Sequence, residues 1–321
     1  MIPAQIIKVI QDNESFLAHA HIGPDIDSLG SVLALKLGLE SIGKTVDLFC
    51  EDRIPDFAKF LPVNLVEHIN SENALTLNPD VYLSIDTAKW ELATHTRPVP
   101  KLTLPIINID HHPDNNIKTD LSWVDGRKAS TASMIYQLLI DLDIKITKEI
   151  ATCLLAGLLG DTNVLQNTNT DSAALKLTYE LTKLGADYHT CIFHLKRSKS
   201  PEQLKLWSRL LDMIQISPDK TFVWITLSYS QCQELKAQDL GNFVNNFLSS
   251  VKGTKFGAML AEKQKGITKG YLRTRKEIDV SQIAHMLNGG GHPAAAGFRI
   301  EKPANIAEQE FLSVVNSLDI L

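Results

Sequence analysis

Side chains suited to metal chemistry are concentrated in the stretch AHIGPDIDSLGS, residues 20–31. His21, Asp25 and Asp27 fall within seven residues of one another, and imidazole and carboxylate groups are common metal ligands. The residues before them read as the end of a buried strand. The next apolar side chains recur at helical spacing, at Leu29, Val32, Leu33 and Leu37. The acidic cluster therefore lies where a strand gives way to a helix, which is where open α/β sheets bind ligands.

Two later segments end in the same way. DVYLSID reads as a buried strand that ends at Asp86, and LPIINIDHH reads as another that ends at Asp110, His111 and His112. Because parallel strands share a direction, their carboxyl ends lie along one edge of the sheet. We therefore expect the polar groups that follow three strands to meet in a single cleft.

Helical patterns surround these strands. Apolar periodicity predicts a further strand over 45–50 and helices over 3–13, 28–41, 130–141, 148–160, 171–184 and 187–197. The helix over 148–160 is almost entirely apolar, which favours a position buried between layers. It is followed by Asp161 in a loop with several asparagines, a composition suited to turns or to contacts with a ligand.

A boundary between two domains is predicted near Arg197. The chain has 321 residues, more than a single core usually serves. We predict a catalytic domain over 1–196, a linking helix over 197–213 and a smaller substrate-binding domain over 214–321. The last contains predicted strands in FVWITLS, KFGAMLAE and GITKGYLRTR, and helices near 240–250 and 279–288. The predicted fold class is α/β, with a mostly parallel sheet flanked by helices, a smaller mixed sheet, and a cleft between the domains.

Composition narrows the class of protein. The 32 basic and 37 acidic residues give a net charge of −5, which argues against binding long duplex nucleic acid. A local run from Lys252 to Lys276 nevertheless holds eight basic residues and one acidic one, Glu262. This run could be a substrate groove or simply a solvated face. The four cysteines are far apart, and we see no signal peptide or membrane span. We therefore expect a cytoplasmic protein without a membrane partner.

The clustered acids indicate a metal site. Asp25, Asp27, Asp86 and Asp161, gathered with His21 and His111, would repel one another strongly without cations. Two divalent cations would balance the four charges. The mixed but mainly carboxylate ligands favour manganese, with magnesium and cobalt as alternatives. Two such ions activate water for in-line attack on phosphorus, which describes a phosphoesterase.

A structural role is the alternative for each of these groups when it is taken alone. Asp27 or Ser28 could cap the following helix, and an aspartate at the end of a strand is a common turn residue. The joint pattern outweighs these alternatives, because seven polar groups at three consecutive strand ends would be costly without a function.

The late stretch NGGGHPAAAG, which begins at Asn288, suggests an anion site. Its proline is predicted at the first position of a helix. The amides of Gly290, Gly291 and His292 could then hold a phosphate, with Arg273 or Arg275 adding charge-assisted hydrogen bonds. A flexible loop before a short helix is the alternative.

These residues together carry a family resemblance. HIGPDID, SIDTA, the literal DHH at 110–112, GDT at 160–162 and the late GGGH occur in this order. The chain resembles DHH-family phosphoesterases with the DHH-associated carboxyl-terminal domain, over essentially its whole length. Its size is similar to that of the nanoRNase and pAp-phosphatase branch. The GGGH loop separates it from family II pyrophosphatases.

The resemblance implies a role for each matching residue. One ion would be bound by His21, Asp25 and Asp86, and a second by Asp27, Asp86, His111 and Asp161. His112 would face the scissile phosphate, with Asp110 supporting the ligands as a catalytic residue. Substrate-binding roles fall to Arg273, Arg275 and the loop formed by Gly289, Gly290, Gly291 and His292. The loop after Asp161 lacks the glycine and the aromatic residue often found there, so stacking on the substrate base is not implied.

The leading hypothesis is a manganese-dependent enzyme that cleaves short RNA oligonucleotides to mononucleotides and removes the 3'-phosphate of adenosine 3',5'-bisphosphate (pAp). Its substrates would be short RNA and nucleotide phosphates, and a homodimer is left open. A phosphodiesterase for linear or cyclic dinucleotides, such as pApA or cyclic di-AMP, is an alternative. A catalytically silent nucleotide sensor is an alternative of another class, although every expected ligand position is filled.

Overall fold

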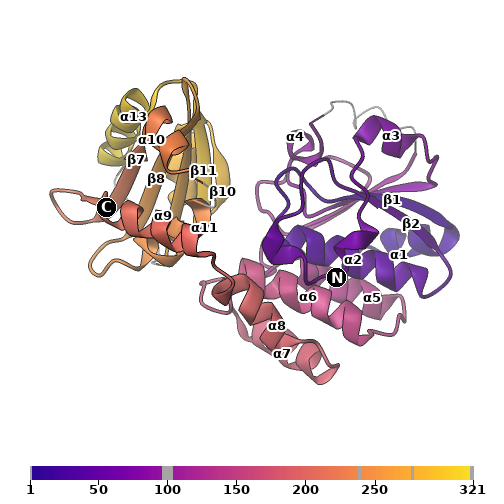
Figure 1. Cartoon of the computed structure of the whole chain (residues 1–321). Helices are drawn as coiled ribbons and strands as arrows, with labels where there is room; N and C mark the ends of the chain where they lie inside the picture. Colours follow the sequence, from indigo (N-terminus) through magenta and orange to yellow (C-terminus); the bar gives the residue numbers. More distant parts are fainter. Residues whose placement is uncertain (1, 96–103, 238–239, 276–277, 319–321) are drawn as a thin grey trace. The chain divides into compact units, whose positions relative to one another are not determined.

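The computed structural model of the chain describes residues 2–95, 104–237, 240–275 and 278–318. These residues form two compact units, Met1–Ser198 and Lys199–Leu321 (Figure 1). Each unit has its own sheet and its own core, and the two are described separately below.

The sheet of the first unit is entirely parallel within the described residues and has the strand order β2-β1-β3-β4-β5. Its strands are β1 (Ser15–His19), β2 (Thr45–Phe49), β3 (Val81–Ile85), β4 (Ile106–Asp110) and β5 (Leu121–Val124). In register, His19 lies beside Ser84 and Ile85 beside Ile109, so β1, β3 and β4 end nearly level with one another. This alignment brings the segments after the three strands to the same edge of the sheet.

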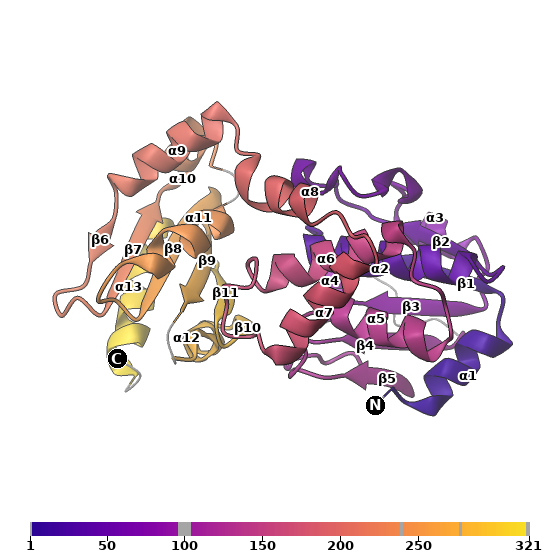
Figure 2. The same ribbon diagram turned by 90° about the horizontal axis from the view of Figure 1, so that it is seen from below.

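Helices cover both faces of this sheet (Figures 1 and 2). The helices of the unit are α1 (Ala4–Asp12), α2 (Ile26–Glu40), α3 (Ser71–Leu75), α4 (Trp90–Ala93), α5 (Thr131–Asp141), α6 (Lys148–Asp161), α7 (Ser172–Lys183) and α8 (Tyr188–Ile192). A five-residue π-helix, Phe193–Arg197, continues α8. The large core packs α2, α5 and α6 against one face, and a smaller cluster with α3 and α4 lies on the other. As the sequence predicted, α6 is almost wholly buried.

The second unit has a mixed sheet with the strand order β10-β11-β9-β8-β7-β6. Its strands are β6 (Gln215–Ile216), β7 (Phe222–Leu227), β8 (Phe256–Gln264), β9 (Ile267–Thr274), β10 (Gly290–His292) and β11 (Ala295–Ile300). Its helices are α9 (Pro201–Leu211), α10 (Tyr229–Glu234), α11 (Leu240–Asn246), α12 (Val280–Met286) and α13 (Ala304–Ser317). Helices α9, α10 and α11 pack on one face, and α12 and α13 pack on the other.

The predicted α/β class is confirmed for two domains, the first with a parallel sheet flanked by helices and the second with a mixed sheet, and one local prediction is wrong. The stretch NGGGHPAAAG forms the hairpin of β10 and β11 rather than a loop before a helix, with Pro293 in the turn. Cross-strand bonds between β11 and β9 decide this outcome, and they pair residues far apart in the sequence. The amides of 290–292 therefore do not lie at the start of a helix. Among the described residues, no helix has both the length and the apolar character needed to cross a bilayer.

Candidate active site

The sequence-predicted ligands of the first unit meet at the carboxyl edge of its sheet. His21 follows β1, Asp86 follows β3, and His111 follows β4 directly. Helix α2 contributes two further carboxylates, and the last residue of α6 is Asp161. The alternative weighed for Asp27 and Ser28, capping of the following helix, belongs to another residue. The N-cap of α2 is Asp25, whose Oδ1 accepts hydrogen bonds from the amides of Asp27 and Ser28 at 3.0 and 2.9 Å.

The first group of candidate ligands consists of His21, Asp25 and Asp86, whose ligand atoms lie within 4.8 Å of one another. His21 Nε2 is 3.9 Å from Asp25 Oδ1 and 3.9 Å from Asp86 Oδ2. These separations are too long for hydrogen bonds. They suit atoms that share one ion, because two ligand atoms with bonds of about 2.1 Å lie about 3.0–4.2 Å apart. His21 Nδ1 is 2.9 Å from the carbonyl of Ile22, which favours a proton on Nδ1 and a lone pair on Nε2.

The second group consists of Asp27, Asp86 and His111, again within 4.8 Å. His111 Nε2 lies 3.9 Å from Asp27 Oδ2, 3.8 Å from Asp86 Oδ1 and 2.9 Å from Asp161 Oδ2. Its Nδ1 is 3.3 Å from the carbonyl of Lys128. The structure thus brings together all six residues predicted as metal ligands, in two groups that share Asp86.

The carboxylate shared by the two groups is held in an unusual backbone conformation. Asp86 has φ +55°, in the left-handed region that non-glycine residues rarely adopt. Thr131 Oγ1 donates a hydrogen bond of 2.7 Å to Asp86 Oδ1, and the side chain is only 2% exposed. Backbone strain of this kind persists where the surroundings over-determine it, and it is concentrated at functional sites.

Asp27 is completely buried and is fixed by the start of α5. The amide of Thr131 donates to Asp27 Oδ2 at 2.7 Å, and the amide of Ala132 donates to Asp27 Oδ1 at 2.9 Å. A helix N-terminus stabilises a negative charge in this position. The close approach also needs Gly157, where an added Cβ would lie 2.6 Å from Asp27 Oδ1 and 2.7 Å from Ala132 Cβ.

Burial and mutual repulsion give these groups abnormal proton affinities. Burial and the charges of Asp86 and Asp161 raise the pKa of Asp27 well above its usual value. Burial, with a contribution from Asp25, raises the pKa of Asp86 to about 6. Burial lowers the pKa of His111, but Asp161, Asp86 and Asp27 outweigh it and the net pKa is raised. The site therefore favours added positive charge, and its mixed imidazole and carboxylate ligands fit divalent metal ions.

Asp110 and His112 form a separate pair beside the two groups. His112 Nδ1 is 2.7 Å from Asp110 Oδ1 and 3.8 Å from Asp86 Oδ1. Burial opposes the charge on His112, but the hydrogen bond to Asp110 and its charge raise the pKa of His112 to about 9. Burial likewise opposes ionisation of Asp110, yet the hydrogen bond from His112 leaves the pKa of Asp110 lowered. The pair is therefore an oriented imidazolium next to the candidate ligands.

The loop after Asp161 has three successive residues in the left-handed conformation: Asn163, Val164 and Leu165, with φ of 50°, 62° and 61°. Asparagine tolerates this conformation better than most residues, whereas a β-branched valine does not. The turn is held by several bonds, including one from Lys196 Nζ of the π-helix to Asn163 Oδ1. A glycine at any of these three positions would be unstrained.

Two of the predicted substrate-binding residues, Arg273 and His292, lie on one face of the second unit's sheet. Arg273 of β9 is in register with Ala295 of β11, which is in register with His292 of β10. Directly opposed residues share a face, and the side chain between Arg273 and His292 is only a methyl group. Two residues earlier in β9, on the same face, Tyr271 is in register with Gly297. The β11 residues in register with Arg273 and Tyr271 are therefore both small.

The predicted glycines and Arg275 have different surroundings. Gly290 and Gly291 pair with Gly297 and Ala296 in the hairpin, and an added Cβ on Gly289 would lie 2.1 Å from the carbonyl oxygen of Gly297. Arg275 donates to the carbonyl of Asn245 at 2.9 Å and to Ser249 Oγ at 3.2 Å. Of the basic run predicted from Lys252, Lys276 lies outside the described residues.

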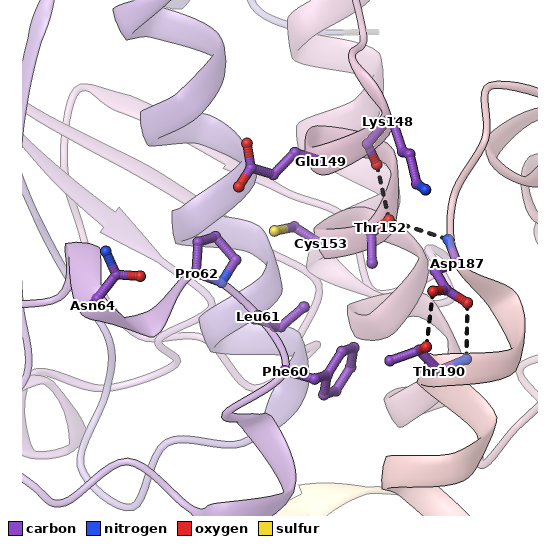
Figure 3. A pocket seen from close by; sticks show the side chains of 10 residues that line it. All are labelled: Phe60, Leu61, Pro62, Asn64, Lys148, Glu149, Thr152, Cys153, Asp187 and Thr190. Carbon is purple, nitrogen blue, oxygen red and sulfur yellow. Dashed lines mark hydrogen bonds between the residues drawn. The ribbon is translucent and has the colours of Figure 1, made fainter.

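A separate pocket lies beside the amino-terminal half of α6 (Figure 3). Its volume is about 530 Å³, and it is lined by Phe60, Leu61, Pro62, Asn64, Lys148, Glu149, Thr152, Cys153, Asp187 and Thr190. Residue 153 is about 12 Å along the helix from Asp161. Its polar groups bond to each other, since Thr152 Oγ1 accepts from the amide of Asp187 and donates to the carbonyl of Lys148.

Sequence analysis missed the residues that support the candidate ligands. Thr131 contacts both Asp27 and Asp86, although it lies 104 residues from the first. Asn115 donates a hydrogen bond to Asp110 Oδ2 at 2.6 Å. His19 is fully buried at the end of β1, between Tyr82 Oη at 2.9 Å and Thr87 Oγ1 at 3.0 Å. A polar residue within an apolar strand was the only sequence signal for His19.

Two family models and several known proteins match this chain. Residues 15–158 match the DHH family, N-terminal domain, and residues 225–318 match the DHHA1 domain. The chain is 30% identical over 295 residues to the bifunctional oligoribonuclease and PAP phosphatase NrnA of Thermus thermophilus, covering 92% of this chain and 86% of that protein. It is 25% identical over 301 residues to the protein of the same name from Bacillus subtilis, covering 92% of each.

Two solved structures share the fold. An exopolyphosphatase-related protein from Bacteroides fragilis has a TM-score of 0.87 and 23% identity, covering 98% of this chain and 97% of that one. RecJ in complex with Mn²⁺ from Thermus thermophilus has a TM-score of 0.58 and 17% identity, covering 98% of this chain and 53% of that one.

Proposed function

We propose a metal and a substrate class from one premise: this chain belongs to the DHH family and is a metal-dependent phosphoric ester hydrolase. The proposed metal is manganese, bound as two ions. The proposed reactions are hydrolysis of short RNA oligonucleotides to mononucleotides and removal of the 3'-phosphate of pAp. The relatives from Thermus and Bacillus support these substrates, since both are named as bifunctional oligoribonuclease and PAP phosphatase.

The observation that carries the proposal is the pair of ligand groups that share Asp86. His21, Asp25 and Asp86 would hold one ion, and Asp27, Asp86, His111 and Asp161 would hold the other. Two divalent ions so placed lower the pKa of a water and neutralise charge on a phosphate during in-line displacement.

Other groups of the first unit orient the proposed ligands and would stabilise charge on the substrate. The carbonyls of Ile22 and Lys128 orient His21 and His111 so that each presents Nε2 to the carboxylates. His112, charged because of Asp110, would face the scissile phosphate and stabilise negative charge that develops there.

For the second unit we propose that Arg273 and His292 hold the terminal nucleotide or phosphate of the substrate. The register of β9, β11 and β10 supports this role, because it places the Arg273 and His292 side chains on one face. Arg275 is proposed only as a support for Arg273's strand, since its guanidinium already bonds to Asn245 and Ser249.

The test is hydrolysis of a 5'-labelled RNA dinucleotide by metal-stripped protein, with and without manganese, beside pAp and a longer RNA. We expect manganese to restore rapid cleavage of the dinucleotide and of pAp but not of the longer strand. Cleavage of cyclic di-AMP with none of the dinucleotide or pAp would overturn the proposed substrates. Equal activity with and without manganese, after stripping is verified, would overturn the proposed metal.

A further inference from the structure

A side chain outside every predicted site is bonded directly to the Asp110–His112 pair. Asn115 follows β4 and is half-buried. Its Nδ2 donates to Asp110 Oδ2 at 2.6 Å and to the carbonyl of Thr87 at 3.0 Å. Its Oδ1 accepts from the amide of Ile117 at 2.9 Å and from Asn108 Nδ2 at 3.2 Å. The amide group of this one residue therefore makes four hydrogen bonds.

The orientation of the Asn115 amide follows from its two backbone partners, one of which is a donor and the other an acceptor. The amide of Ile117 can only donate, so it must face Oδ1, and the carbonyl of Thr87 can only accept, so it must face Nδ2. These two contacts exclude a flipped amide. One Nδ2 hydrogen is thus aimed at Asp110 Oδ2, and the amide is held in place by Thr87, which follows β3, and by Ile117, which lies between β4 and β5.

The hydrogen bond from Asn115 determines which oxygen of Asp110 accepts from His112. Asp110 is completely buried, and a carboxylate there has two oxygens to satisfy. Asn115 occupies Oδ2, which leaves Oδ1 for the ring nitrogen of His112 at 2.7 Å and for the amide of His112 at 3.2 Å. Rotation of the carboxylate would break the bonds on both sides.

We propose that Asn115 is a positioning residue for the reaction, which acts through Asp110 to hold the His112 ring toward the phosphate. This inference rests on the proposed role of His112. Asn115 touches none of the six candidate metal ligands in the contacts described above, so its influence runs through the pair and not through metal binding. A partner that orients a catalytic side chain in this way typically changes activity by about 10–100-fold.

The experiment compares Asn115→Ala with Asn116→Ala in the full chain. Asn116 is the exposed neighbour, and its backbone bond to Ala88 is kept in the control variant. Hydrolysis of bis(p-nitrophenyl) phosphate and of pAp is measured at saturating manganese, together with manganese binding by calorimetry. For Asn115→Ala we expect kcat to fall about 10–100-fold, with KM and manganese affinity within about twofold of the wild type. Asn116→Ala should match the wild type.

A double-mutant cycle separates positioning from general support of the fold. If Asn115 acts through Asp110, Asn115→Ala should lower kcat less than about twofold further in an Asp110→Asn background. A full additional loss in that background would overturn the inference, as would wild-type kcat in folded Asn115→Ala.

Outcomes that involve folding are also decisive. If Asn115→Ala does not fold, Asn115→Gln takes its place, because a longer amide cannot meet all four partners. Wild-type kcat for Asn115→Gln, or failure of both variants to fold, would leave only a structural role and overturn the inference. A wild type that cleaves bis(p-nitrophenyl) phosphate but not pAp or short RNA would instead contradict the proposed substrates and leave the role of Asn115 intact.

Discussion

The two units carry their polar groups in opposite ways. In the first unit the candidate metal ligands lie beyond the ends of buried parallel strands, and Asp27, Asp86 and His111 are almost completely buried. In the second unit the cationic side chains of Lys269 and Arg273 lie on strand β9 itself. They alternate with buried residues and remain exposed or half-exposed. Charge is costly to bury, so the first arrangement needs a compensating cation, whereas the second needs none.

This difference predicts how strongly a substitution in each unit should affect activity. A buried carboxylate that is shared between ligand groups has no substitute, so its loss should be severe. A half-exposed cation acts through water-screened attraction, and its loss should be moderate. The predictions below test that ranking, in order of decreasing expected effect.

Asp86→Ala should abolish catalysis. The variant removes the one carboxylate common to both ligand groups, so we expect kcat to fall by at least about 1,000-fold and manganese binding to be lost at both positions. Steady-state kinetics and calorimetry provide the measurement, with Asp120→Ala, an exposed aspartate of the same unit, as the matched control. Retention of one full-affinity ion would refute the shared role of Asp86.

Manganese binding should weaken as the pH falls. The stability of the metal-free protein should instead increase as the pH falls. Because burial raises the pKa of Asp86 to about 6, a bound proton competes with the metal below that pH. Apparent manganese affinity should thus fall by up to about tenfold per pH unit for each proton displaced. In metal-free protein, the folded state binds more protons than the unfolded state, so the contribution of Asp86 to stability is lost as pH rises through 6.

Calorimetric titrations and thermal unfolding between pH 5 and 8 would check both signs. The second unit, without such a cluster in its described residues, should show neither trend. A pH-independent manganese affinity would argue that Asp86 is already ionised in the metal-free protein.

Arg273→Ala should raise KM by about tenfold and change kcat little. We expect this split because a residue that binds ground state and transition state equally affects KM alone. Kinetics with pAp would measure it, and Arg299→Ala, on the same face of the sheet but near its opposite end, is the control. A pure loss of kcat would place Arg273 at the chemistry and would break the contrast between the units.

Lys269→Ala should have the smallest effect. The Lys269 ammonium lies 5.3 Å from the centre of the Tyr271 ring. We expect KM to rise less than about threefold, in line with the modest energy of an exposed cation–π contact. An effect larger than that of Arg273→Ala would show that substrate binding depends more on this end of β9.

Sequence reasoning located the candidate ligands because their position depends on simple rules. His21, Asp86 and His111 each follow an apolar run, and parallel strands bring such ends to one edge. The same reasoning failed at Pro293, because proline after glycines locally favours the start of a helix, whereas pairing with β9 across the sheet favours a hairpin.

The supporting residues could not be predicted for a different reason. Asn115 and Thr131 are ordinary polar residues in ordinary loop and cap positions. Their roles depend on how closely α5 approaches α2 and how the loop after β4 folds back on β3. Such approaches are set by packing between distant segments, which leaves no local pattern in the sequence.

The strand order of the two sheets also bears on the order in which they assemble. Every pairing in the first sheet is parallel. Strand β1 pairs with β3, which lies far along the chain, since Phe16 is in register with Val81. In the second sheet, β8 and β9 form an antiparallel hairpin around Lys265 and Gly266. Because non-local pairing slows folding, we expect the second unit to refold first. Trp207 and Trp224 should then regain native fluorescence before Trp90 and Trp123 of the first unit.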